Sequence, residues 1–122
     1  MKINKRRIGV LHSMVLLLCM LISMTAYSQS AQSGKNVQII EPPDLNRLCL
    51  FFTLVGVPVA DPGVPGGGPW FAVEQAHPGY KEIYAALMIA SVTGRTVTVI
   101  TTGQALTACS NLARVNVVLL NP

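Results

Sequence analysis

The chain has 122 residues, of which 51% are hydrophobic and 11% are charged, and its formal net charge is +4 at pH 7. The basic excess lies at the N-terminus, because the charges beyond residue 28 cancel: Lys35, Arg47, Lys81, Arg95 and Arg114 against Glu41, Asp44, Asp61, Glu74 and Glu82. Nucleic-acid binding requires a surface rich in Lys and Arg, so this composition excludes a nucleic-acid partner.

Residues 1–28 have the pattern of a cleaved bacterial secretory signal. An apolar run over 14–22 follows four basic residues, Lys2, Lys5, Arg6 and Arg7. Small residues come next, and Ala26 and Ser28 favour cleavage after Ser28, with a cut after Ala26 as the alternative. The run is shorter than the roughly 20 residues of a bilayer span. We therefore expect a periplasmic or secreted protein with no stable membrane span after cleavage; an uncleaved N-terminal anchor is the rival interpretation.

About 94 residues remain, which is enough for one domain with a modest core. They contain two cysteines, Cys49 and Cys109. In an oxidising compartment this pair predicts one disulfide, and on the chain-entropy model a loop of about 60 residues contributes about 4 kcal/mol. The alternative is two unpaired buried thiols.

The first elements predicted after the signal are a polar tail and two strands. Residues 29–35 are small and polar and predict a disordered N-terminal tail, so the domain is expected over 36–122. Residues 36–40 alternate apolar and polar side chains, as a half-buried strand does. Residues 48–55 form a continuous apolar run, which predicts a strand covered on both faces.

A stretch dense in Pro and Gly separates this strand from the next. Residues 56–69 predict a long exposed loop, and residues 70–74 a short strand. Gly66, Gly67 and Gly68 are not followed by the Gly-Lys-Ser/Thr motif of a phosphate-binding loop. We interpret them as loop flexibility.

A helix follows, because Pro78 stands near its predicted start and Gly94 just past its end. One face at helical spacing carries Tyr80, Ile83, Tyr84, Leu87 and Ser91. The opposite face is also apolar and carries Ala85, Met88, Ile89 and Val92. A helix that is apolar all round is usually covered on both sides, so we expect these four residues to form an oligomer interface. The alternative is that Met88 and Ile89 lie under the long loop.

Two strands complete the chain. Residues 95–102 alternate β-branched side chains, 103–111 form a connection containing Cys109, and 112–120 form the last strand. One face of this strand is predicted to carry Val115, Val117 and Leu119. The order β-β-β-α-β-β predicts a small α+β domain, a five-stranded OB-like, partly open barrel with its helix between the third and fourth strands.

The segment GYKEIYAALMIASVTGRTVTVITTG, followed by a cysteine and the strand ARVNVVLL, resembles small exported bacterial proteins related to the B subunits of AB5 toxins. The pattern is similar above all to the pertussis-like and subtilase-cytotoxin-like subunits. The resemblance implies an OB-type barrel, a ring of five copies with helices towards the centre, and recognition of sialylated glycans. The long Pro/Gly loop and the shortage of polar strand residues depart from that family.

Chemical motifs are sparse. His77 is the only histidine beyond residue 28 and precedes Pro78 at the helix entrance, which favours a capping or loop role over catalysis. No metal-ligand cluster or cofactor motif is present in the sequence, and Glu74 and Glu82 have no reason to act as an acid–base pair. Trp70 beside the flexible loop is a candidate for stacking on a sugar ring, with entry into the core as the alternative. Candidate polar rim groups are Thr101, Thr102, Ser110 and Asn111, or these residues serve ordinary turns.

The sequence therefore predicts an exported, non-catalytic binding module for a glycan or a protein surface, which forms a homo-oligomer such as a pentamer. The alternative is a structural or inhibitory envelope protein that docks on one protein partner through its helix. A small hydrolase is the third class, and no nucleophile and base can be paired for it.

Overall fold

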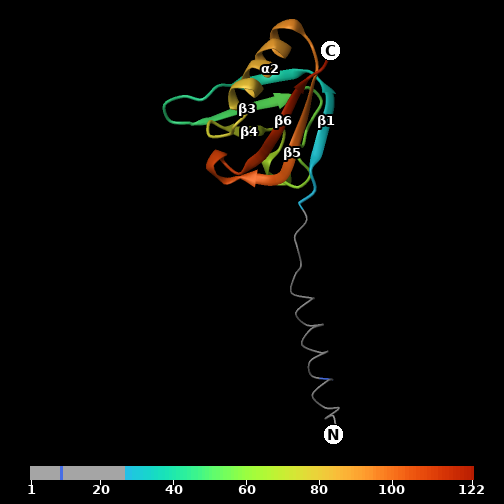
Figure 1. The fold of residues 1–122 in the computed structure, drawn as a ribbon, viewed down its shortest axis with the longest axis vertical. Coiled ribbons are helices and arrows are strands. Elements are labelled where there is room, and N and C mark those ends of the chain that lie inside the picture. The colour runs from blue at the N-terminus through green and yellow to red at the C-terminus, as the bar shows by residue number, and fades with distance from the viewer. Residues whose placement is uncertain (1–8, 10–26) are drawn as a thin grey trace, which may run out of the picture.

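The structure, a computed structural model, describes residue 9 and residues 27–122. This part of the chain is an α+β domain with one α-helix and one six-stranded sheet, so the predicted α+β class is confirmed. Helix α2 lies at one end of the sheet (Figure 1). In chain order the elements are β1 (Ser30–Lys35), β2 (Val37–Glu41), β3 (Cys49–Leu54), η1 (Pro65–Gly67), β4 (Phe71–Glu74), α2 (Tyr80–Thr93), β5 (Val97–Leu106), η2 (Thr107–Cys109) and β6 (Leu112–Leu120).

The sheet is mixed, with the strand order β1-β5-β6-β4-β3-β2. β4 and β6 are parallel and the other neighbours are antiparallel. β1 and β2 are consecutive and separated only by Asn36, yet they lie at opposite edges of the sheet. One continuous segment, residues 30–41, thus pairs with β5 through its first half and with β3 through its second half.

The sheet has six strands rather than the five expected. Residues 30–35 form the additional strand, so the prediction of a disordered tail over 29–35 was wrong for these residues. These residues form β1, whose backbone pairs with β5. Their small polar side chains give no amphipathic signal. The strand depends on main-chain pairing and on the contact of the Ser30 hydroxyl with the Thr101 hydroxyl at 3.0 Å. The predicted signal over residues 1–28 falls almost wholly outside the described residues.

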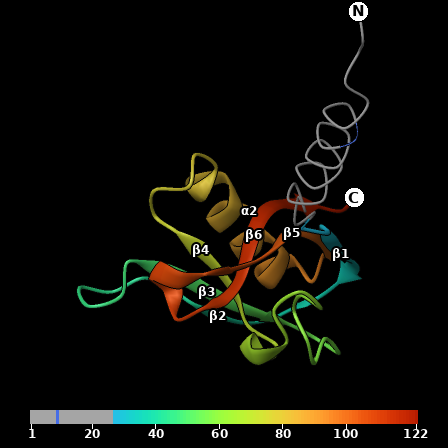
Figure 2. The ribbon, with the colours of Figure 1, turned by 90° about the horizontal axis from the view of Figure 1, so that it is seen from below.

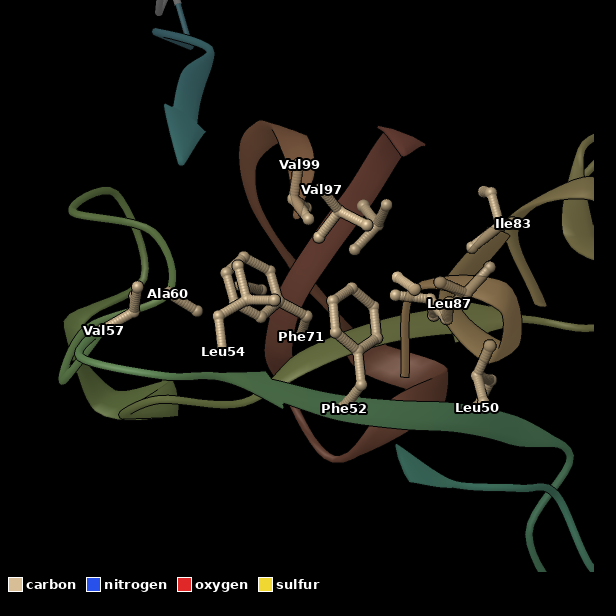
Figure 3. Close-up of a cluster of buried hydrophobic side chains, with 14 residues drawn as sticks. Leu50, Phe52, Leu54, Val57, Ala60, Phe71, Ile83, Leu87, Val97 and Val99 are labelled. Atoms are coloured by element: carbon tan, nitrogen blue, oxygen red, sulfur yellow. The ribbon is translucent and has the colours of Figure 1, made fainter. Parts of the chain in front are cut away.

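The main hydrophobic core lies between β3, the neighbouring strands and α2. All six residues of β3 are buried, as the apolar run predicted. Phe52 and Phe71 stack at the centre with ring centroids 4.9 Å apart. Figure 3 shows Ile83 and Leu87 of the helix at one end of this core and Val57 and Ala60 at the other.

The Pro/Gly loop over 56–69 is partly built into the fold, which corrects the expectation of an exposed loop. Ala60 is fully buried, and Asp61 is only 1% exposed. Asp61 accepts hydrogen bonds from the backbone N–H of Gly63 at 2.8 Å and of Gly103 at 2.9 Å. Glycine is required at 103, because its φ of 77° lies in the left-handed region and a Cβ there would clash with the Ser28 carbonyl oxygen. The loop therefore closes one end of the core through a buried carboxylate.

β5 continues to Leu106, so part of the connection predicted over 103–111 is strand. The pairing of β5 with β6 shifts register at two places, between Ile100 and Thr101 and between Thr101 and Ala105. Asp61 binds the second irregularity through the Gly103 N–H. A strand pattern alone does not reveal such bulges, because they are stabilised by partners elsewhere in the chain.

β6 has the predicted bounds, but the prediction that Val115, Val117 and Leu119 share one face was wrong. Val115 pairs with Thr101 and Val117 with Ile100, which leaves Asn116 as an extra residue on β6. The bulge reverses the alternation. Val115 is therefore buried, while Val117 is 36% exposed and Leu119 is 49% exposed. The side chains that pack on the core beyond the bulge are those of Val118 and Leu120.

Helix α2 lies where the sequence predicted it, with Pro78 just before its start and Gly94 just past its end. Gly94 ends it in the left-handed conformation, with a φ of 72°, and donates its N–H to the Ala90 carbonyl at 2.9 Å. At the start, Nδ1 of His77 accepts the N–H of Gly79 at 2.9 Å, and Nε2–H donates to the Asn116 carbonyl at 3.1 Å. Because a backbone N–H can only donate, these contacts correspond to the neutral Nε2–H tautomer. Gly79 itself is the N-cap and no side chain caps the helix, so His77 has the predicted loop role, and its two contacts connect the turn before α2 to the bulge in β6.

No helix in the described part of the chain is long and apolar enough to cross a membrane.

Candidate ligand-binding site

A second, smaller hydrophobic cluster lies on the outer face of the sheet. The predicted disulfide joins Cys49 on β3 to Cys109 on η2, with their Cα atoms 5.9 Å apart. Alternation along β3 places Cys49 and Phe51 on the face opposite Leu50 and Phe52, which belong to the main core. The outer cluster consists of Cys49, Phe51, Ala72, Leu106 and Cys109, with Trp70 and Leu112 packed against it. The disulfide thus holds η2 over the outer face.

A surface hollow of about 180 Å³ adjoins this cluster, and we call it the Trp70 hollow. It is lined by Glu41, Arg47, Phe51, Trp70, Ser110 and Leu112. Trp70 is half-buried, so part of its indole packs on the cluster while part faces the hollow. Trp70 thus enters a hydrophobic cluster in part, and its stacking on a sugar ring stays a prediction. The lining of the hollow thus combines two aromatic rings with a carboxylate, a guanidinium and a hydroxyl group.

A second hollow, of about 310 Å³, lies next to the first and shares Arg47, Phe51 and Ser110 with it. Cys49 and Cys109 also line it. Together the two hollows extend from Trp70 along the outer face to the disulfide. Their walls belong to the β2–β3 connection on one side and to η2 with the residues after it on the other.

Arg47 is the cation of the Trp70 hollow, and two carboxylates bind it. Nη1 of Arg47 lies 3.2 Å from Oε2 of Glu41, and Nε lies 3.3 Å from Oδ2 of Asp44. Glu41 pairs with Phe51 across the β2–β3 ladder, so its side chain lies on the outer face. The three side chains carry a net charge of −1.

Asp44 also orders the β2–β3 connection, which extends away from the sheet in Figures 1 and 2. Its Oδ1 atom accepts the backbone N–H groups of Asn46 and Arg47, each at 2.8 Å. The Asn46 N–H is the largest influence that lowers the pKa of Asp44 below its ordinary value of 3.8, and the contacts with Arg47 act in the same direction. The carboxylate form therefore stabilises the turn that carries Arg47.

The structure brings only some of the predicted ligand-binding residues together. Trp70 and Ser110 line the same hollow. Ser110 and Asn111 form the turn after the disulfide in the left-handed region, with φ of 60° and 56°, and both residues are exposed. Thr101 is fully buried on β5, so its predicted place at the rim was wrong. Thr102 accepts the backbone N–H of Gln104 at 3.3 Å, which is ordinary turn chemistry.

Sequence reasoning did not single out Glu41, Arg47, Phe51 or Leu112 as lining residues. The available signal is the hairpin register. If residues 37–41 and 49–54 pair as an antiparallel hairpin, Glu41 comes opposite Phe51, and the intervening turn returns Arg47 to the same face.

The comparisons with protein-family models, curated proteins and solved structures found no match for this chain. The site must therefore be interpreted from its own geometry. Among residues 27–122, no group of three or more His, Cys, Asp or Glu side chains is placed to hold a metal ion.

A further feature is the outward face of α2. Met88 is 41% exposed, Ile89 46% and Val92 81%, and Ala85 is exposed as well. The alternative in which Met88 and Ile89 lie under the Pro/Gly loop is excluded by their exposure. Figure 3 shows the reason, because the loop residues Val57 and Ala60 lie at the end of the core away from the helix.

Proposed function

We propose that this protein is an exported, non-catalytic binding module that recognises a glycan through the Trp70 hollow. The observation that carries the proposal is the half-buried Trp70, whose indole lines a hollow together with Arg47 and Ser110. An aromatic ring held in this way offers a large apolar contact at low cost in conformational entropy. The surrounding charged and hydroxyl groups supply the few polar contacts that orient a ligand.

The proposal includes an OB-type closure of the sheet. Residues 30–41 reach both edges of the sheet as one segment bent near Gly34 and Asn36, which supports a barrel in which β1 and β2 act as one strand. The parallel pair β4 and β6, and a helix between β4 and β5, agree with that arrangement. The resemblance to AB5 B subunits also implies a ring, in which the exposed face of α2 contacts neighbouring copies.

The export part of the proposal rests on the N-terminal pattern and on the Cys49–Cys109 disulfide, because such bonds persist in oxidising compartments. Mass spectrometry of the chain recovered from the periplasm and medium of an expressing bacterium tests it. We expect a product that begins at Tyr27 or Gln29 and has no free thiol. An intact N-terminus with reduced cysteines would contradict export.

A glycan array probed with the exported, oxidised protein tests the binding function. We expect Trp70→Ala to lose at least about tenfold in affinity, which corresponds to the loss of one aromatic contact of about 1.4 kcal/mol. Trp70→Phe is the matched control, because it retains an apolar ring and should keep much of the binding. If wild type binds no glycan, or if Trp70→Ala binds as well as wild type, the proposal fails.

A second candidate function is a structural or inhibitory envelope protein that docks on one protein partner. The exposed Met88, Ile89 and Val92 on α2 favour it. Crosslinking from a photoreactive residue at position 92 in living cells distinguishes docking on a different protein from assembly of the ring. Crosslinks to a different protein support docking, whereas crosslinks between copies of this chain support the ring.

A further inference from the structure

We propose that the Trp70 hollow selects an uncharged sugar and discriminates against sialylated and other anionic glycans. This inference rests on the proposed function and goes beyond it by naming the ligand class. It also departs from the resemblance to AB5 B subunits, which implies sialylated ligands. The charges that surround the hollow carry the inference.

Both cations on this face of the sheet already have carboxylate partners. Arg47 contacts Glu41 at 3.2 Å and Asp44 at 3.3 Å. Arg114, two residues along β6 from Leu112, lies 3.6 Å from Glu74. The remaining cations beyond residue 28 are Lys35 on β1, Lys81 on α2 and Arg95 just after α2, and none of them lines the hollow. An anionic ligand therefore has to compete with a carboxylate for any guanidinium that it reaches.

The local charge also opposes an anion. Glu41, Asp44 and Arg47 together carry −1, so a third carboxylate brought to Arg47 by a ligand meets two negative groups and one positive group. Like charges at short distance repel, and removal of water from the contact strengthens the repulsion. Arg47 is the only arginine among the residues that line the hollow. The carboxylate of a sialic acid is therefore disfavoured beside it.

An uncharged sugar fits the same groups. Arg47 binds Oε2 of Glu41, and the carboxylate has a second oxygen, Oε1, that accepts hydrogen bonds. Sugar hydroxyl groups donate such bonds, and the Ser110 hydroxyl both donates and accepts. Trp70, Phe51 and Leu112 provide the apolar wall against which the carbon face of a sugar ring packs. In this arrangement Arg47 fixes the position of Glu41, and Glu41 recognises the ligand.

The test compares paired glycans on the exported, oxidised protein, for example lactosamine-terminated chains with and without terminal sialic acid. We expect the uncharged member of a pair to bind at least about tenfold more tightly. Tighter binding of the sialylated member overturns the inference and leaves the proposed function standing. Failure of both members of every pair refutes the proposed function, and this inference with it.

Neutralising single carboxylates distinguishes an effect of the charges beside Arg47 from an effect of the protein's net charge. Glu41→Gln and Asp44→Asn each remove one carboxylate from Arg47 while keeping the side-chain shape, and Asn at 44 retains an acceptor for the turn. Each should shift the preference several-fold towards the sialylated member. Glu82→Gln on α2 changes the net charge equally and should leave the preference unchanged. An equal shift in all three variants, or no shift in Glu41→Gln and Asp44→Asn, would overturn the assignment of the charge effect to the hollow.

Discussion

Two side chains hold the irregular positions of the sheet. Asp61 accepts the N–H of Gly103 in β5, and His77 donates to the carbonyl of Asn116 in β6. Both contacts satisfy backbone groups that regular ladder pairing does not reach at a bulge. Each side chain also orders its own segment, through Gly63 for Asp61 and through Gly79 for His77.

Asp61 is a residue at which substitution should destabilise the fold without affecting the Trp70 hollow. Asp61→Ala leaves the Gly63 and Gly103 N–H groups without their acceptor, and we expect a loss of about 3 kcal/mol in the free energy of unfolding. Asp61→Asn keeps one acceptor and should lose less. Urea denaturation measures both values. A loss below about 0.5 kcal/mol for Asp61→Ala would contradict an anchoring role.

The turn that carries Arg47 should respond to pH through Asp44. Because the pKa of Asp44 is lowered in the folded state, the carboxylate contacts contribute fully above its ordinary value of 3.8 and are lost as pH falls through the lower, folded value. The Asn46 amide resonance, followed by NMR, should therefore titrate with a midpoint below 3.8. A midpoint at or above that value would show that the N–H contacts do not stabilise the ionised form.

At the scale of elements, the disulfide connects stability to the site. It closes a loop of 60 residues and fixes η2, whose neighbour Ser110 lines the hollow. We expect Cys49→Ala with Cys109→Ala to lower the free energy of unfolding by about 4 kcal/mol, a large part of the stability of so small a domain. Urea denaturation of the double variant and of reduced wild type should agree. Full stability in both would show that the bond does not constrain the chain.

Several elements could be predicted because their signals are local. Pro78 and Gly94 mark the ends of α2, and the apolar run of residues 48–55 marks β3, since these patterns depend on backbone geometry and on burial. β1 and the two bulges could not be predicted. β1 has no hydrophobic signal, and the bulges depend on Asp61 and His77, which are distant in sequence from the strands that they bind.

The site was predictable to a similar extent. Trp70 and Ser110 stand out by residue type and by position beside a loop or a cysteine. Glu41 and Arg47 do not, because their place in the hollow follows from the register of the β2–β3 hairpin and from the Asp44 turn. Thr101 was misplaced because alternation along β5 directs it into the interior, where it contacts Ser30.

For the whole molecule, the exposed face of α2 predicts self-association. Val92 is 81% exposed, and it continues the apolar surface of Met88 and Ile89. Light scattering at several concentrations should give a stable oligomer, with a pentamer expected from the proposed ring. Val92→Glu should yield monomers without loss of fold, whereas Ser91→Glu, at an exposed position that the sequence pattern assigns to the other face of the helix, is the control for one added negative charge. A wild-type protein that stays monomeric at all concentrations would contradict the ring.

The proposed binding of an uncharged glycan at Trp70 can be tested directly, because this residue is the only tryptophan in the sequence. Titration of the oxidised protein with the best uncharged glycan from the array should produce a saturable change in tryptophan emission, with the same midpoint as binding measured by calorimetry. The sialylated counterpart should produce this change only at higher concentration. Binding by calorimetry with no change in emission would place the glycan away from Trp70 and contradict the proposed site.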